Sequence, residues 1–152
     1  MEPASFTKSL GILIEDISAH EGTLWLLDDE AQNLVPSWNS GSSANNFVGK
    51  FQQPLVGGLI SLVCITGQAI CENEVYQHVG QDPRLDQQLG VKTCSMIAVP
   101  IRVGGEIRGV VSCVRLKATG DNIPDPPPFS TQDLRAVIEA VESMGSRLTE
   151  EL

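Results

Sequence analysis

Apolar residues recur at intervals of three and four at both ends of the chain. The N-terminal set is Phe6, Leu10, Leu13, Ile14 and Ile17, and the C-terminal set is Leu134, Val137, Ile138, Val141, Met144 and Leu148. These intervals place each set on one face of a helix. Pro3 suits the first turn of the N-terminal helix, and Ser130 with Asp133 has the spacing of a capping box before the other. The pattern predicts amphipathic helices over residues 3–18 and 131–150.

Between these helices, short apolar runs separated by polar turns predict the strands of a sheet. Residues 23–27 and 34–38 form the first two runs, and residues 51–54 and 68–71 predict two more short strands. Because proline cannot donate a ladder hydrogen bond, Pro36 predicts that its strand lies at an edge or carries a bulge.

Glycine-rich and proline-rich segments predict the connections. The polar residues 39–50 predict a mobile surface loop, and the proline-rich residues 117–128 predict an exposed, stiff loop. The apolar residues 59–65 stand between glycines and predict one or two helical turns.

Two apolar strands meet at Gly104-Gly105 and predict a hairpin. If the glycines form a two-residue loop, Val103 faces Glu106. Counting back from the loop then gives Ile101–Arg108, Val99–Val110 and Ile97–Ser112 on one face, and Ala98–Val111, Met96–Cys113 and Cys94–Arg115 on the other. Both faces are apolar at the strand centres, so we expect this hairpin in the middle of the sheet, covered on both sides.

The order of these elements predicts an α+β fold. It consists of a central antiparallel β-sheet with the N- and C-terminal helices packed on one face. At 152 residues the chain has the size of a single domain, residues 1–152, with its core in residues 22–116.

Several short motifs occur in a fixed order along the chain. They are Glu21-Gly-Thr-Leu-Trp-Leu-Leu-Asp28, Gly58-Leu-Ile-Ser61, Asp82-Pro-Arg84, Val99-Pro-Ile101, Gly105-Glu-Ile-Arg-Gly-Val110 and Phe129-Ser-Thr-Gln-Asp-Leu134. Together they resemble the GAF domain, a small-molecule sensor module of signalling proteins and cyclic-nucleotide phosphodiesterases. The resemblance covers about residues 20–148.

The resemblance implies a GAF/PAS-like architecture with a ligand pocket on the sheet face opposite the terminal helices, roofed by residues 57–89. The candidate pocket residues are Trp38, Leu59, Ser61, Cys71, Arg84, Leu85, Asp86, Met96 and Cys113. The implied function is a non-catalytic sensory or regulatory domain. It binds an unidentified small molecule and relays the signal through its terminal helices to an output module in the same or a partner chain. Asp82 and Arg84 are expected to brace their own loop before they serve a ligand.

The specialised ligand motifs of the family are missing. Members of the family that bind cyclic nucleotides carry a motif of the type Asn-Lys-x-x-x-Phe-Asp-x-x-x-Asp-Glu after the last hairpin strand. This chain keeps only Phe129 and Asp133 of that motif. Bilin-binding members attach the pigment through a cysteine commonly followed by histidine, and no cysteine here has that neighbour. His20 and His78 are the candidate haem ligands and are expected to be solvated. The sequence therefore names no cofactor.

The four cysteines, Cys64, Cys71, Cys94 and Cys113, lack the spacing of a zinc site, so we expect free thiols in a reducing cytoplasm. A GAF-like enzyme, free methionine-(R)-sulfoxide reductase, uses pocket cysteines, but its Gly-Val-Cys-Gly turn and Ala-Cys-Asp segment are absent. We therefore expect no catalysis. Cys94, near Lys92, is the one thiol with a setting that would favour a thiolate, and its reactivity stays open.

The net charge of −9 disfavours nucleic acid and anionic membrane surfaces as partners. No apolar run approaches the length of about 20 residues that spans a bilayer, so a cytoplasmic location is expected.

A second interpretation is a ligand-free dimerisation scaffold. Its interhelical seam would be formed by Phe6, Leu10, Leu13, Val141, Met144 and Leu148. On either interpretation the terminal helices predict a homodimer through residues 3–18 and 131–150. A void with converging polar groups favours the sensor, and a filled core favours the scaffold.

Overall fold

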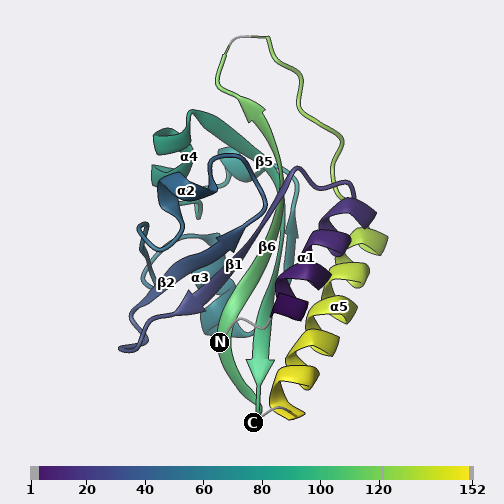
Figure 1. The fold of residues 1–152 in the computed structure, drawn as a ribbon. Helices are drawn as coiled ribbons and strands as arrows, with labels where there is room; N and C mark the ends of the chain where they lie inside the picture. The colour runs from purple at the N-terminus through teal and green to yellow at the C-terminus, as the bar shows by residue number, and fades with distance from the viewer. Residues whose placement is uncertain (1–3, 121, 151–152) are drawn as a thin grey trace.

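The structure is a computed structural model that describes residues 4–120 and 122–150. This part of the chain forms a six-stranded antiparallel sheet in the order β3-β2-β1-β6-β5-β4, with helices on both faces (Figure 1). The strands are β1 (Glu21–Leu27), β2 (Asn33–Asn39), β3 (Gln53–Pro54), β4 (Ile70–Glu72), β5 (Val91–Val103) and β6 (Glu106–Ala118). The helices are α1 (Ala4–Asp16), α2 (Ala44–Phe47), α3 (Leu59–Thr66), η1 (Val75–Gln77), α4 (Arg84–Leu89) and α5 (Thr131–Glu150). The predicted α+β architecture is confirmed.

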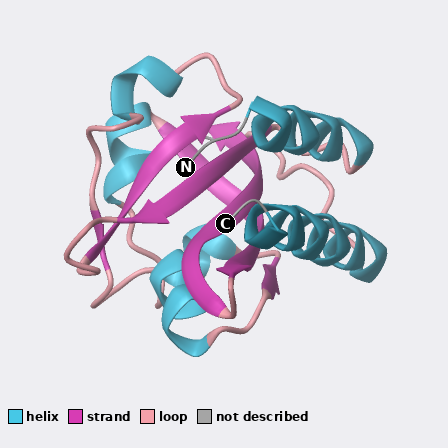
Figure 2. Ribbon diagram, turned by 60° about the horizontal axis from the view of Figure 1, so that its bottom comes forward, coloured by secondary structure: helices cyan, strands magenta, loops and turns pink. Residues whose placement is uncertain are grey.

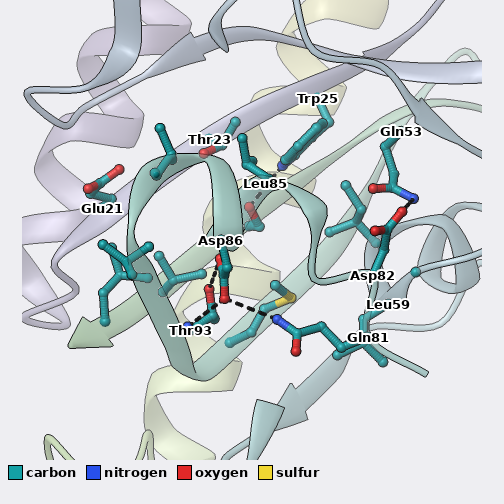
Figure 3. Close-up of a pocket in the computed structure, with 18 of the residues that line it drawn as sticks. Glu21, Thr23, Trp25, Gln53, Leu59, Gln81, Asp82, Leu85, Asp86 and Thr93 are labelled. Atoms are coloured by element: carbon teal, nitrogen blue, oxygen red, sulfur yellow. Dashed lines mark hydrogen bonds between the residues drawn. The ribbon is translucent and has the colours of Figure 1, made fainter. Parts of the chain in front are cut away.

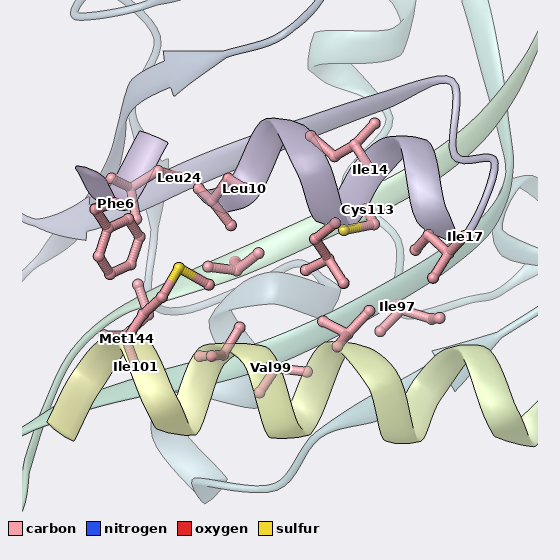
Figure 4. Close-up of a cluster of buried hydrophobic side chains, with 14 of the residues drawn as sticks. Phe6, Leu10, Ile14, Ile17, Leu24, Ile97, Val99, Ile101, Cys113 and Met144 are labelled. Carbon is pink, nitrogen blue, oxygen red and sulfur yellow. The ribbon is translucent and has the colours of Figure 1, made fainter. Parts of the chain in front are cut away.

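The terminal helices α1 and α5 lie side by side on one face of the sheet (Figure 2). Their apolar stripes point toward the sheet and bury a cluster that also contains strand residues such as Ile97, Val99 and Cys113 (Figure 4). In this cluster the helices contribute Phe6, Leu10, Leu13, Ile14, Val137, Val141 and Met144, and Ile17 joins them from the turn after α1. We call this the helix-side cluster.

This packing corrects the predicted dimer seam. Phe6, Leu10, Leu13, Val141 and Met144 are all buried within one copy of the chain, so they cannot form a seam with a second copy. Leu148, the sixth seam residue, has a side chain outside the described part of the chain. The stripes explain how the helices dock on their own sheet.

The β5–β6 hairpin lies in the middle of the sheet, but its predicted register is wrong. Val103 faces Glu106 as expected, and the register then shifts by one residue between Ile101 and Arg102. Beyond this bulge the pairs are Pro100–Val110, Val99–Val111, Ala98–Ser112, Ile97–Cys113, Met96–Val114 and Ser95–Arg115. A one-residue slip moves side chains to the opposite face of the partner. Met96 and Cys113 therefore lie on opposite faces of the sheet.

Gly109 lies next to this bulge, where β6 closely approaches β1. It pairs with Leu26 of β1, and a Cβ atom at this position would clash with the carbonyl oxygen of Trp25. Close approach of the two backbones therefore requires glycine here, next to the bulge.

A bulge also occurs where Pro36 predicts one. Trp25 of β1 pairs with Pro36, but its neighbour Leu24 pairs with Trp38, so Ser37 is the extra residue of β2. The bulge turns Trp38 toward the helix-side cluster.

Two predicted loops contain more order than expected. Residues 39–50 include α2, which buries the side chain of Phe47, so this segment is not simply a mobile surface loop. β6 extends to Ala118, which shortens the proline-rich loop. The phenolic hydroxyl of Tyr76 and the ammonium of Lys117 both bind the carboxylate of Asp125 and hold that loop against the sheet. No described helix is long and apolar enough to cross a membrane.

Candidate functional site

The face of the sheet opposite α1 and α5 holds a cavity of about 100 Å³ (Figure 3). Strands β1, β2, β5 and β6 supply its floor, and α2, α3 and α4 supply its walls and roof. The space is enough for several water molecules or one small organic molecule. It lies where the family resemblance implies a ligand pocket.

Three polar side chains form a row across the floor of the cavity. Thr23 of β1 is the register partner of Asn39 on β2 and of Ser112 on β6, and the three are 7%, 8% and 4% exposed. The Asn39 Nδ2 donates to Thr23 Oγ1 at 2.8 Å, and Trp25 Nε1 donates to Ser112 Oγ at 3.0 Å. We call Asn39, Thr23 and Ser112 the polar row.

Both hydroxyl groups of the polar row act as acceptors in these bonds. Among the described residues, no acceptor lies within hydrogen-bonding reach of the hydroxyl hydrogen of Thr23 or of Ser112. A hydroxyl can donate one hydrogen bond while it accepts another. The floor therefore offers two donors to whatever fills the cavity.

Asp86 of α4 fastens the roof to the sheet. Its carboxylate accepts hydrogen bonds from the Thr93 backbone N–H at 2.7 Å and from Thr93 Oγ1 at 2.8 Å. A third bond comes from Gln81 Nε2 at 3.1 Å, as Figure 3 shows. These bonds tie α4 to the start of β5.

Asp82 braces the segment that leads into the roof. It accepts hydrogen bonds from the Arg84 backbone N–H at 3.1 Å and from Gln53 Nε2 at 3.1 Å, and it forms an ion pair with Arg84 Nη2 at 2.9 Å. The hydrogen bonds from the Arg84 guanidinium hold the pKa of the Asp82 carboxyl below its ordinary value. These contacts agree with the structural role expected for Asp82 and Arg84.

The family model for the GAF domain matches residues 6–148. The chain belongs to the GAF domain family. The recognition made from its motifs is confirmed, and the family is one of sensory and regulatory domains. A search of curated protein sequences finds no match.

Solved structures with the same fold include GAF domains and an enzyme. A GAF domain/HD domain protein from Geobacter sulfurreducens is 18% identical, with a TM-score of 0.72 over 97% of this chain and 91% of that one. The GAF-B domain of DevS from Mycobacterium smegmatis is 14% identical, with a TM-score of 0.73 over 99% and 95%. The free methionine-R-sulfoxide reductase from Neisseria meningitidis, solved with its substrate, is 16% identical, with a TM-score of 0.73 over 97% and 79%. At these identities the likeness shows the fold alone.

Four of the nine predicted pocket residues line the cavity of this GAF domain. They are Leu59, Leu85, Asp86 and Met96. The others lie elsewhere. Trp38, Cys71 and Cys113 pack in or against the helix-side cluster. The bulge in β2 turns Trp38 to that face, and the shifted hairpin register puts Cys113 there. Cys71 of β4 pairs with Ile97, whose side chain belongs to the same cluster.

Ser61 and Arg84 also lie outside the lining of the cavity. Ser61 is buried in α3, where its Oγ donates to the Pro54 carbonyl oxygen at 2.8 Å. The Arg84 guanidinium lies over the ring of Phe51, 5.2 Å from its centroid, and lines a neighbouring surface groove with Lys50.

The sequence analysis missed the polar residues that distinguish the cavity, namely Glu21, Thr23, Asn39, Gln53 and Ser112. One signal was available. Glu21, Thr23 and Trp25 alternate along a strand, so they share one face, and that face carries unusual polarity for the centre of a covered sheet.

The cysteines of this GAF domain do not line the cavity in the described structure. Burial raises the pKa of Cys113 to about 12 and raises the pKa of the Cys64 and Cys94 thiols. The pKa of Cys71 is raised by burial and by nearby carboxylates. Cys94 is 1% exposed and occupies a bulge, so that Ser95, and not Cys94, stands opposite Arg115. The described residues contain no cluster of three or more His, Cys, Asp or Glu that could hold a metal ion.

Proposed function

We propose that this GAF domain is a non-catalytic sensory domain that binds one small molecule in the cavity. The observation that carries the proposal is the polar row. Buried polar groups cost free energy unless they are paired, and a sheet face that only packs against helices has no need of them. Donors directed at an unfilled space support a ligand site more than a filled scaffold core.

The proposed relay uses β6, which has one side on the cavity and the other on the terminal helices. Val114 and Leu116 line the cavity, whereas Arg115 between them points to the opposite side. The Arg115 guanidinium donates to the carbonyl oxygens of Ile17 at 2.8 Å and Ser18 at 3.2 Å, just beyond α1. A shift of β6 on ligand binding would therefore move the end of α1.

The same guanidinium reaches the segment before α5. It donates to the carbonyl oxygens of Pro127 at 2.8 Å and Pro128 at 3.1 Å and lies 4.4 Å from the ring centroid of Phe129. One side chain thus joins both terminal helices to the strand that forms the cavity floor. This supports a relay to an output module in the same or a partner chain.

Thermal unfolding with a panel of small metabolites, together with native mass spectrometry of the purified domain, tests the proposal. A ligand that binds the folded state raises the midpoint of unfolding. Thr23→Val keeps the side-chain shape and removes the hydroxyl, so it should abolish that rise. Thr131→Val, at an exposed threonine, should leave it unchanged. If no compound binds, or if Thr23→Val leaves binding unchanged, the proposal is wrong.

The absence of catalysis is part of the proposal. The buried thiols with raised pKa values support it, because a thiolate is the nucleophile in sulfoxide reduction. Free methionine sulfoxide with dithiothreitol as reductant should be left unreduced. Turnover that is lost in Cys94→Ser would contradict this. Homodimerisation stays a prediction, but the buried residues first expected to form the dimer seam cannot form it. Sedimentation over a concentration series would measure the oligomeric state.

A further inference from the structure

The cavity has charges of one sign only. Its lining includes the carboxylates of Glu21, Asp82 and Asp86, and no Lys, Arg or His among the described residues contributes to it. Two of these carboxylates have visible structural tasks. Asp82 is neutralised by Arg84, and Asp86 is held by the neutral donors of Thr93 and Gln81.

Glu21 has no such task. It stands at the start of β1, two residues from Thr23 and on the same face of the strand. No described residue donates a hydrogen bond to its carboxylate or forms an ion pair with it. The side chain is only partly exposed, so water satisfies it incompletely.

The loop after β2 lies against this carboxylate. A Cβ atom at Gly41 would collide with the carboxyl group of Glu21. The loop is fixed by other bonds. The Gly22 backbone N–H donates to Ser40 Oγ at 3.0 Å, and the Gly41 backbone N–H donates to Asn39 Oδ1 at 2.7 Å. The loop therefore packs against Glu21 and offers it no donor.

We infer that the cavity takes a small organic ammonium that also carries a neutral oxygen, with Glu21 as its counter-ion and the hydroxyls of Thr23 and Ser112 as donors to the oxygen. This inference rests on the proposed function, because it names the ligand class of the same cavity. A buried anion there would face uncompensated carboxylates and no cation, which is costly. Trp25 and Phe47 in the lining add aromatic surface that suits a cation.

Size and overall charge point the same way. About 100 Å³ is well below the roughly 300–1,000 Å³ typical of drug-sized ligand pockets, so the ligand has few heavy atoms. The net charge of −9 raises the local concentration of cations around the protein and lowers that of anions.

Isothermal titration calorimetry with matched probes tests the inference. The ammoniums are choline and ethanolamine, the uncharged isostere of choline is 3,3-dimethylbutan-1-ol, and the anions are propionate and inorganic phosphate. On the wild-type protein, at least one ammonium should bind about tenfold more tightly than the uncharged alcohol, and the anions should not bind.

A pair of variants then assigns the charge effect. Glu21→Gln keeps the side-chain size and should weaken ammonium binding about tenfold, while the alcohol binds as before. Glu106→Gln removes an exposed carboxylate on the hairpin, 72% exposed, and should change nothing. Circular dichroism verifies that both variants are folded.

The outcomes separate the ligand class from the cavity itself. If the alcohol or an anion binds as tightly as the ammoniums, and Thr23→Val abolishes that binding, the ligand class is wrong and the sensor proposal stands. If Glu21→Gln leaves ammonium binding unchanged, the role of Glu21 is wrong. If neither these probes nor the metabolite panel binds, the inference and the proposed function both fail.

Discussion

The indole Nε1 of Trp25 donates a hydrogen bond to Ser112 Oγ across β1 and β6, at 3.0 Å, and both side chains are buried. Ser112→Ala removes the acceptor and leaves a buried N–H without a partner. We expect a loss of about 1–3 kcal/mol in the free energy of unfolding, measured by urea denaturation. The double variant Trp25→Phe with Ser112→Ala should lose less than the sum of the two single variants, because the unpaired donor is gone. Additive losses would mean that the hydrogen bond contributes nothing.

The fastening of the roof by Asp86 is the second testable feature. Asp86→Ala removes three hydrogen bonds and should destabilise the domain by about 1–3 kcal/mol. Amide hydrogen exchange should rise mainly in residues 84–93, because α4 loses its tie to β5. Gln87→Ala, at an exposed position of the same helix, is the control and should leave exchange unchanged. Uniformly faster exchange across the sheet would contradict a local role.

The lowered pKa of Asp82 predicts an acid-dependent loss of stability. Because the folded-state pKa lies below the unfolded value, the contribution is present above the unfolded pKa and is lost as pH falls through the folded pKa. Asp82→Asn should therefore cost about 1 kcal/mol near neutral pH and progressively less as the pH falls below about 4. Denaturation at several pH values measures this, with the exposed Asp29→Asn as control. An effect of Asp82→Asn that does not vary with pH would show that its charge is unimportant.

Gly109 tests the close approach of β1 and β6. Since a Cβ atom would clash with the backbone carbonyl of Trp25, Gly109→Ala should destabilise the domain by about 2 kcal/mol or more. Gly11→Ala is the matched control, because the added Cβ meets no atom within 4 Å outside its own stretch of helix and the position is inside α1. That variant should gain about 0.5–1 kcal/mol from helix propensity. Equal midpoints of thermal unfolding for the two variants would refute the predicted clash.

The thiols should differ in their reaction with iodoacetamide. Cys64, Cys94 and Cys113 are buried, whereas Cys71 is partly exposed. In the native protein at pH about 8 we expect modification to be slow, because the raised pKa values keep all four thiols protonated. We expect it to be confined to Cys71, because only this thiol is accessible to the reagent. Modification of Cys94 faster than Cys71, seen by peptide mass spectrometry, would show that Cys94 is a reactive thiol after all.

The elements that sequence predicted well are those specified by local periodicity. The stripes from Phe6 to Ile17 and from Leu134 to Met144 repeat over three or more turns, which is enough to fix both the helix and its buried face. The hairpin is also specified locally, because its glycine pair marks a turn between two apolar strands.

The side chains that line the cavity depend on information that local periodicity does not contain. The bulge beside Gly109 lies where the backbone of β6 closely approaches Trp25 on another strand. It shifts the pairing of residues 109–115 with β5 by one residue, until a second bulge between Thr93 and Ser95 restores the original register. Leu85 and Asp86 line the cavity, whereas Arg84 of the same helix α4 does not, so the family resemblance locates the roof segment but not which of its side chains face inward. Thr23 and Asn39 were missed because their partners became known only with the sheet order.

The polar row also bears on the order of folding. Asn39 and Thr23 are 16 residues apart, whereas Trp25 and Ser112 are 87 residues apart. Closing the longer loop costs more chain entropy, so the β1–β2 side of the row can assemble well before β6 arrives. The floor of the cavity is complete only when the last long-range strand pairing has formed. A molecule that binds there would therefore slow the unfolding of the domain and leave the early steps of its folding unchanged.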